Sequence, residues 1–263
     1  MEIAIAELPE QTGEDRALSH DAGVIVLDGA TSHAPGIPSA RRYVDVLGAA
    51  LVGRLGRADT LREILADAIR GTTEVLDLQP NSSPSSTVAI VQIQTRSVEV
   101  LVLGDTTVIV GFNDGRYEVI TDDRLSNLAI PESAEYQRRL AEGAGYDDTH
   151  RRLLRELQRQ QHSQRNRSTG YWIAEADPSA ADQAVLTSYS CDSVGWVVVA
   201  TDGARDTLEA IGIGWRDIAV QQPAALLDLL ARCHDWEADV DPDGRRLPRA
   251  KRHDDKTIAV IRL

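Results

Sequence analysis

Acidic side chains stand at the ends of four of the most apolar runs in this chain. Residues 24–27 (Val-Ile-Val-Leu) lead directly to Asp28 and Gly29, and residues 196–200 lead through Thr201 to Asp202. In chain order, the carboxylates at these ends are Asp28, Asp105, Asp202 and Asp254, with Asp206 following shortly after Asp202. Neighbouring glycines let one backbone approach another closely. We therefore expect these strand ends to converge on one rim of the fold.

Carboxylates that converge in this way repel one another unless a cation lies between them. Hard divalent cations such as Mg²⁺ and Mn²⁺ bind carboxylate oxygens and waters. The sequence has no His-x-x-x-His or closely spaced Cys pair of the kind that zinc prefers. A carboxylate site with two such ions suits phosphate-ester hydrolysis, because a bridging water becomes the nucleophile and the ions stabilise charge on the phosphoryl oxygens. A single Asp-Gly is usually a turn, so the hypothesis depends on the whole set.

The elements that must position these aspartates are mostly short strands. Tight turns such as Asn113-Asp114-Gly115 separate several of them, which predicts hairpins and an antiparallel sheet. The expected strands are residues 3–6, 24–27, 87–94, 98–103, 107–112, 117–120, 184–187, 196–200 and 257–263.

Two amphipathic helices interrupt the strands, at residues 40–55 and 61–76, because apolar side chains recur there every three or four positions. Asp59 or Thr60 can cap the second of them. A third helix is expected to begin at Pro223. The order of elements predicts an α+β sandwich in one domain: strands, a helical pair, more strands, then a helix and a strand. The polar, Arg-rich stretch at residues 132–167 is interpreted as an insertion or flap on that sandwich.

Composition excludes several other classes. The chain has 263 residues, with 28 basic and 41 acidic side chains and a formal charge of −13. This argues against a general nucleic-acid or anionic-membrane binder. Cys191 and Cys233 are too few for a disulfide scaffold and fit a reduced, intracellular protein. No signal-peptide pattern or membrane-length apolar run is present, so we expect a soluble, cytoplasmic protein. We also expect it to be a monomer.

Seven motifs resemble, in order, those of the metal-dependent protein serine/threonine phosphatases of type 2C, the PPM family. They include a Glu-Asp pair, an apolar strand ending in Asp-Gly, a Gly-Asp-Thr and a Thr-Asp-Gly-x-x-Asp sequence. They lie at residues 14–16, 24–29, 85–89, 103–106, 120–123, 199–206 and 253–257. The resemblance implies a four-layer α-β-β-α sandwich of two antiparallel sheets flanked by paired helices. It also implies a flap within residues 124–180.

The resemblance implies a role for each matched residue. Asp28 would bridge two Mg²⁺ or Mn²⁺ ions, and the carbonyl of Gly29 would bind one of them. Asp202 and Asp254 would be ligands of the other ion, so these three aspartates act in catalysis through the activated water. Asp105 and Asp206 would serve a third, weaker metal site. The outer-shell residues that hold metal-bound waters would be Glu14 and Asp15.

Three positions depart from the family pattern. Where the family has a phosphate-binding Arg, this chain has Glu10, followed by Gln11. No His follows Asp28-Gly29 directly, and we interpret His33, four positions beyond Gly29, as an ordinary loop residue rather than a general acid. Asp255 replaces the usual Asn and is expected to face solvent.

The basic residues before Asp254 are candidates for meeting the phosphate instead, the alternative being a solvated basic loop that offsets local acid. Residues 245–252 contain five basic side chains just before Asp254, and guanidinium groups can bind phosphate with two hydrogen bonds. The candidates for phosphate binding are Arg16, Arg41, Arg249 and Arg252. Residues 138–167 hold eight Arg against four acids, which we interpret as a solvated helix and loop.

The leading hypothesis is a metal-dependent phosphatase that removes phosphate from Ser and Thr of a phosphorylated protein in signalling. Glu10 motivates an alternative, a catalytically weak phosphatase-like module that binds phosphoproteins or a regulator. A two-metal hydrolase of small phosphate esters or nucleotides is a third possibility that the residues allow.

Overall fold

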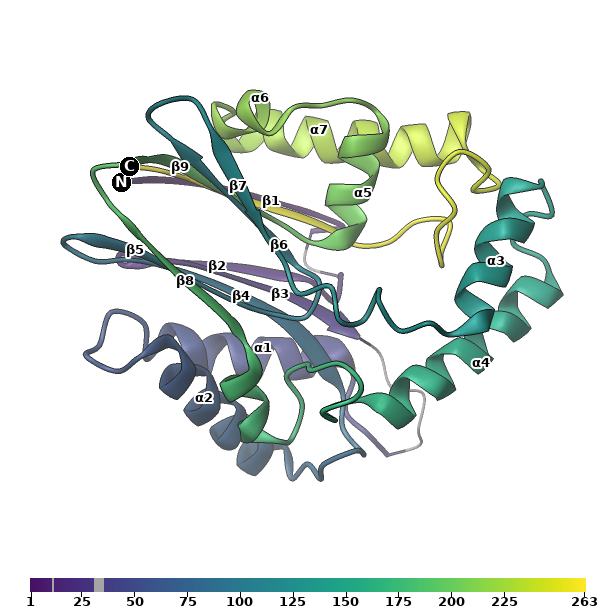
Figure 1. The fold of residues 1–263 in the computed structure, drawn as a ribbon, viewed down its shortest axis with the longest axis horizontal. Helices are drawn as coiled ribbons and strands as arrows, with labels where there is room; N and C mark the ends of the chain where they lie inside the picture. Colours follow the sequence, from purple (N-terminus) through teal and green to yellow (C-terminus); the bar gives the residue numbers. More distant parts are fainter. Residues whose placement is uncertain (11, 31–35) are drawn as a thin grey trace.

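A computed structural model describes residues 1–10, 12–30 and 36–263 of the chain. Within these residues, ten strands form two five-stranded antiparallel sheets (Figure 1). In spatial order, the first sheet consists of β1 (Glu2–Leu8), β10 (Lys256–Arg262), β9 (Val194–Ala200), β6 (Thr107–Phe112) and β7 (Tyr117–Ile120). The second sheet consists of β2 (Arg16–His20), β3 (Gly23–Ala30), β4 (Ser85–Ile93), β5 (Ser97–Leu103) and β8 (Val185–Ser190).

Helices cover the outer face of each sheet. The second sheet is covered by α1 (Ala40–Val52) and α2 (Leu61–Leu76), and the first by α5 (Asp202–Ala210), α6 (Trp215–Ala219) and α7 (Pro223–Asp235) (Figure 1). A short 3-10 helix, η1 (Pro178–Gln183), packs on α2, and a π-helical turn, η2 (Trp236–Val240), extends α7. The expected α-β-β-α sandwich is confirmed.

Strand β3 shows why its sequence is apolar without interruption. Ile25 and Leu27 pack among the side chains of α1 and α2. Val24 and Val26 point the other way and join the cluster between the two sheets. Because alternate side chains of a strand face opposite sides, a strand covered on both faces reads as a continuous apolar run. The run therefore ends where the strand leaves the core, and Asp28 lies at that point.

Local signals set the helix boundaries. Thr60, not Asp59, caps α2, and with Glu63 it forms a capping box in which each side chain accepts from the other residue's backbone N–H. The predicted turn at Asn113-Asp114-Gly115 joins β6 to β7, and Gly115 adopts a φ of 86°. Such a positive φ favours glycine.

Several elements were not expected, among them β2, α5 and α6. Strand β2 was missed because Arg16, Ser19 and His20 break its apolar pattern, although it pairs with β3 along its length. Helix α5 was not predicted, because Asp202 was interpreted only as a carboxylate at the end of an apolar strand and not as the first residue of a helix.

The Arg-rich stretch forms two helices beyond the edge of the sandwich. They are α3 (Pro131–Ala141) and α4 (Asp148–Gln164), which pack on each other through Tyr136, Leu140 and Leu157 (Figure 1). Among the described residues, no helix is both long enough and apolar enough to span a membrane.

Candidate metal centre

Four of the predicted aspartates line one cavity of about 700 Å³. Asp28 comes from the end of β3 in the second sheet, and Asp105 from the turn between β5 and β6 that joins the two sheets. Asp202 begins α5, and Asp254 lies in the loop before β10. The structure therefore brings together carboxylates that are up to 226 residues apart in the sequence (254 − 28). The backbone of Gly29 lines the same cavity.

These carboxylates repel one another strongly. Burial, followed by the charges of Asp15 and Asp202, raises the pKa of Asp28 well above its ordinary value. Burial and the charges of Asp105 and Asp254 raise the pKa of Asp202 to about 8. Near neutral pH, a cluster of this kind cannot be fully ionised without a bound cation.

Asp15 lies next to the carboxylate cluster and is held by a hydrogen bond from Thr201. It is only 5% exposed, and its Oδ2 accepts a hydrogen bond from Thr201 Oγ1 at 2.9 Å. Thr201 Oγ1 in turn accepts from the backbone N–H of Thr257 at 3.0 Å. Burial and the charges of Asp255 and Asp254 raise the pKa of Asp15 to about 7. This chain of contacts fixes the start of α5 against the start of β10.

The expectation that Asp255 faces solvent is wrong. It is half-buried, and its carboxylate accepts a hydrogen bond from the backbone N–H of Glu14. The residue thereby ties the loop before β10 to the segment before β2, the same segment that carries Asp15.

Asp206 lies apart from the cavity. Its carboxylate pairs with the guanidinium of Arg205 at 2.6 Å, and Arg205 also donates to Thr107 Oγ1 at 3.0 Å. The charge of Asp206 nevertheless raises the pKa of Asp105, after the larger effect of burial. The two residues are therefore close enough to interact, and the charge of Arg205 acts on both carboxylates.

Two glycines allow the close approaches that the cavity needs. A Cβ atom at Gly29 would lie 2.7 Å from the backbone oxygen of Glu14. A Cβ atom at Gly203 would lie 2.3 Å from the backbone oxygen of Asp255. Both distances are shorter than van der Waals contact, so only glycine fits at the end of β3 and in the first turn of α5.

Basic side chains line the same cavity. Lys251 donates from Nζ to Asp254 Oδ1 at 2.9 Å. Helix α4 contributes Arg155 and Arg159, and Arg165 follows its C-terminus. Arg159 pairs with Glu156 on its own helix, whereas Arg155 has no hydrogen-bond or ion-pair partner in the described part of the chain. The cavity thus presents carboxylates and basic groups to the same space, and among its Lys and Arg side chains Arg155 is the one without a partner in the described chain.

The four arginines proposed from the sequence lie elsewhere. Arg16 pairs with Asp45 at 2.6 Å, and Arg249 pairs with Asp241 at 2.7 Å. Arg252 lies over the ring of Tyr146 at 5.9 Å. Arg41 is exposed on α1, and none of the four is among the lining residues of the cavity within the described chain.

Two departures from the family pattern can also be placed. Glu10 is exposed and does not line the cavity, whereas Gln11 and His33 lie outside the described residues. Lys251 belongs to the basic run before Asp254, which sequence reasoning did find. The arginines of α4 were missed because nothing local to them signals that their helix packs beside a carboxylate cluster.

The donor set fits Mg²⁺ or Mn²⁺. The cavity offers carboxylate and backbone oxygens, which are the ligands that these hard ions prefer. Raised pKa values at Asp28 and Asp202 show that the cluster lacks enough positive charge of its own. Among the described residues that line the cavity, His162 is the only His, and there is no Cys.

The sandwich and its carboxylate-lined cavity together define a protein of the metal-dependent phosphatase class. A family model for protein phosphatase 2C matches residues 11–239. The chain therefore belongs to the protein phosphatase 2C family. The resemblance inferred from its motifs is confirmed.

Solved structures of bacterial phosphatases share the fold. A bacterial serine phosphatase matches with a TM-score of 0.60 at 13% identity, over 99% of this chain and 96% of its own. The serine/threonine phosphatase Stp1 from Staphylococcus aureus matches with a TM-score of 0.58 at 14% identity, over 100% and 94%. The catalytic domain of PstP, solved with two manganese ions, matches with a TM-score of 0.52 at 15% identity, over 98% and 96%. A comparison with curated proteins finds no match.

Proposed function

We propose that this chain hydrolyses phosphoserine and phosphothreonine in proteins, with two divalent cations held by its carboxylate cluster. The observation that carries the proposal is the cavity in which Asp28, Asp202 and Asp254 lie together with basic side chains. Membership of the protein phosphatase 2C family supports it, as does the pair of manganese ions in the PstP structure.

In this proposal Asp28, the carbonyl of Gly29, Asp202 and Asp254 hold Mg²⁺ or Mn²⁺. Asp105 serves a third ion, for which Asp206 would first have to separate from Arg205. When bound, such ions supply a nucleophile from water near neutral pH and offset charge on the phosphoryl oxygens. Glu14 and Asp15 keep the outer-shell role proposed for them, and the contact of Asp15 with Thr201 supports it.

The remaining task, binding the phosphate, falls to the basic lining of the cavity. Lys251 and Arg155 are the side chains we propose for it, since Arg155 has no other partner in the described chain and Lys251 already reaches Asp254. Charge-assisted hydrogen bonds from such groups to phosphate are stronger than those between neutral groups. Lys251 and Arg155 would thus take the place of the phosphate-binding Arg of the family, since this chain has Glu10 at that position.

The proposal extends to the domain organisation, the localisation and the oligomeric state of the protein. We propose one phosphatase domain in which residues 124–180 form a flap, because α4 supplies part of the cavity lining. We also propose a cytoplasmic, monomeric enzyme of signalling. Both cysteines are free thiols, as expected in a reducing compartment.

The direct test compares wild type with Asp202→Asn in hydrolysis of p-nitrophenyl phosphate and of phosphoserine and phosphothreonine peptides, with and without Mn²⁺. The substitution keeps the shape and removes a ligand charge, so we expect activity to fall at least about a hundredfold. Glu209→Gln is the matched control, because Glu209 is exposed on the same helix. It should leave activity unchanged.

The outcomes separate the three hypotheses. Mn²⁺-dependent hydrolysis of the peptides that Asp202→Asn abolishes would support the protein phosphatase. Hydrolysis of p-nitrophenyl phosphate alone would favour a hydrolase of small phosphate esters. Mn²⁺ binding without hydrolysis of either substrate would favour the phosphoprotein-binding module and contradict the enzyme.

A further inference from the structure

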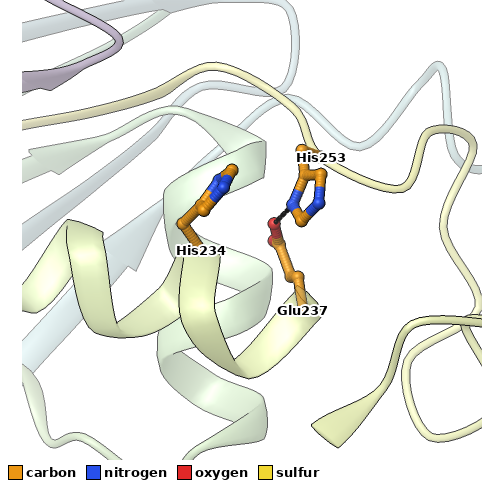
Figure 2. Close-up of side chains that lie close together, drawn as sticks. All are labelled: His234, Glu237 and His253. Carbon is orange, nitrogen blue, oxygen red and sulfur yellow. Dashed lines mark hydrogen bonds and ion pairs between the residues drawn. The ribbon is translucent and has the colours of Figure 1, made fainter. Parts of the chain in front are cut away.

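A second group of potential metal ligands lies outside the carboxylate cavity. His234 is in the last turn of α7, Glu237 is in the π-helical turn η2, and His253 is in the loop before β10 (Figure 2). One ligand atom from each lies within 4.8 Å of the other two. None of the three residues lines the carboxylate cavity within the described chain. Two imidazoles and one carboxylate are a known ligand set for zinc.

Glu237 is already held in a fixed orientation. It is 1% exposed, and its Oε1 accepts a hydrogen bond from Thr207 Oγ1 at 2.7 Å. Its Oε2 accepts from Lys256 Nζ at 2.9 Å and from His253 Nδ1 at 3.0 Å. Outer hydrogen bonds of this kind orient ligating carboxylates in metal sites. The positive charge of Lys256 offsets the carboxylate, so it lowers the affinity for a cation without removing a ligand.

His234 has no partner other than the second imidazole. Its ring stacks on that of His253, with centroids 4.1 Å apart and planes 26° apart. It makes no hydrogen bond or ion pair among the described residues, and it is exposed. Figure 2 shows the two rings side by side, with the carboxylate of Glu237 next to His253. An exposed side chain with no partner can turn toward a ligand at little cost.

The spacing requires only a small adjustment. Ligand atoms about 2.0–2.1 Å from a tetrahedral zinc ion lie about 3.4 Å from one another. His253 Nδ1 and Glu237 Oε2 are 3.0 Å apart, and the widest separation in the group is at most 4.8 Å. The largest change needed is therefore about 1.4 Å, which rotation of the exposed His234 can supply.

We propose that His234, Glu237 and His253 form a binding site for a divalent transition-metal ion, with zinc as the best-matched ion. The ion binds Glu237 Oε2 and His253 Nδ1 in place of the hydrogen bond between them. The proton of His253 moves from Nδ1 to Nε2 by exchange with solvent, so the imidazole stays neutral. Water completes the coordination. The bound ion ties the end of α7 to the loop that carries Asp254.

A π-helical turn supplies a second, independent observation. η2 begins directly after α7, and Glu237 is its second residue. Single π-helical turns are rare and occur frequently at functional sites. Here the turn brings a buried carboxylate beside a His from the preceding turn.

The test is calorimetric titration of the purified full chain with Zn²⁺ in saturating Mg²⁺, repeated in an Asp28→Asn background. Both conditions weaken zinc binding at the carboxylate cavity, and comparison with His234→Ala identifies the part of the signal that comes from the His234, Glu237 and His253 group. We expect one equivalent of Zn²⁺ to bind, and His234→Ala to weaken binding at least about tenfold, because even loss of an outer-shell partner costs that much. Zn²⁺ should also raise the melting temperature of the wild type but not of His234→Ala.

Asp235→Ala is the matched control, since Asp235 is the exposed neighbour of His234 and lies outside the cluster. It should bind Zn²⁺ like the wild type. Absence of Zn²⁺ binding in the wild type would overturn the proposal, and so would equal binding by His234→Ala. The phosphatase proposal is untouched by either result, because no step of this test measures hydrolysis.

Discussion

Lys251 places a positive charge beside the carboxylates of the cavity. The chain contains two lysines, and both contact Asp254. Lys251 Nζ donates to its Oδ1 at 2.9 Å, and Lys256 Nζ donates to its backbone oxygen at 3.0 Å. Burial acts to lower the pKa of Lys251, but the charges of Asp254, Asp28 and Asp202 outweigh it and raise the pKa. The ammonium therefore serves as counter-ion to the cluster when no metal is bound.

Replacing Lys251 with Ala should change two measurable affinities in opposite directions. Metal binding should strengthen, because the divalent ion no longer competes with an ammonium at Asp254. The KM for p-nitrophenyl phosphate should rise about tenfold, the value of one lost charge-assisted hydrogen bond. Calorimetry with Mn²⁺ and steady-state kinetics measure the two effects.

Arg252→Ala is the control for that substitution, because Arg252 is the next residue and lies over Tyr146 outside the cavity. It should change neither affinity. Weaker Mn²⁺ binding by Lys251→Ala would contradict the counter-ion role, and an unchanged KM would contradict the phosphate-binding role.

The sequence predicts the aspartates of the cavity better than its cations. Asp28 and Asp202 could be placed because an apolar strand must end where the core ends, and the glycine beside each marks a close approach. Arg249 was chosen for its nearness to Asp254 in the chain, yet it turns inward to Asp241. Arg155 was overlooked because its position depends on how α4 packs. Side-chain direction in a loop follows from tertiary contacts that no local pattern encodes.

At the scale of elements, the start of α5 decides how the cavity is built. Asp202 is the first residue of the helix, where a negative charge is favoured by the helix dipole. Gly203 follows and touches the loop before β10 through its backbone. This helix, which the sequence did not predict, thus fixes one carboxylate against another.

Gly203→Ala tests this contact between elements. The added Cβ would lie 2.3 Å from the oxygen of Asp255, so α5 and the loop must separate. We expect a loss of about 1–3 kcal/mol in the free energy of unfolding together with weaker Mn²⁺ binding. Denaturant unfolding measures the free energy of unfolding, and calorimetric titration measures the affinity for Mn²⁺.

Gly71→Ala is the matched control, since Gly71 is in α2 and a Cβ there meets nothing within 4 Å. This change should raise the free energy of unfolding by about 0.5–1 kcal/mol and leave Mn²⁺ binding as it is. Unaltered stability and metal affinity in Gly203→Ala would show that the contact is not needed.

The long periodic elements were predictable, and the short or polar ones were not. The helices α1, α2 and α7 have clear apolar faces, and the cluster between the two sheets consists mostly of Val and Ile. Strand β2 holds its place through pairing with β3 rather than through its own pattern. The helices α3 and α4 bury few side chains, so their polar sequence gives little sign of where they pack.

At the scale of the whole molecule, the sandwich tolerates repulsion at one edge because its core is extensive. Apolar clusters lie between the sheets and under each helical layer. The carboxylate cluster acts against this stability whenever it is ionised without a cation. The metal-free fold should therefore respond to pH in a defined direction.

The sign follows from the raised pKa values. Asp202 and Asp15 have pKa values of about 8 and 7 in the fold, against 3.8 in an unfolded chain. Between about pH 4 and 8, the folded protein therefore holds more protons than the unfolded one, and its stability falls as pH rises. Below that window both states are protonated and the effect vanishes. His253, whose pKa is lowered by burial, acts in the opposite sense.

The melting temperature of the metal-free wild type should thus fall, relative to that of Asp202→Asn, by at least about 2 °C between pH 5 and pH 8. Comparing the two proteins cancels the contribution of His253, which both contain. Mn²⁺ should stabilise the wild type more at pH 8 than at pH 5, because it binds the ionised carboxylates that protons otherwise occupy. Glu209→Gln should follow the wild type at every pH. If the melting temperatures of wild type and Asp202→Asn changed equally with pH, the raised pKa of Asp202 would not be the cause of the pH dependence.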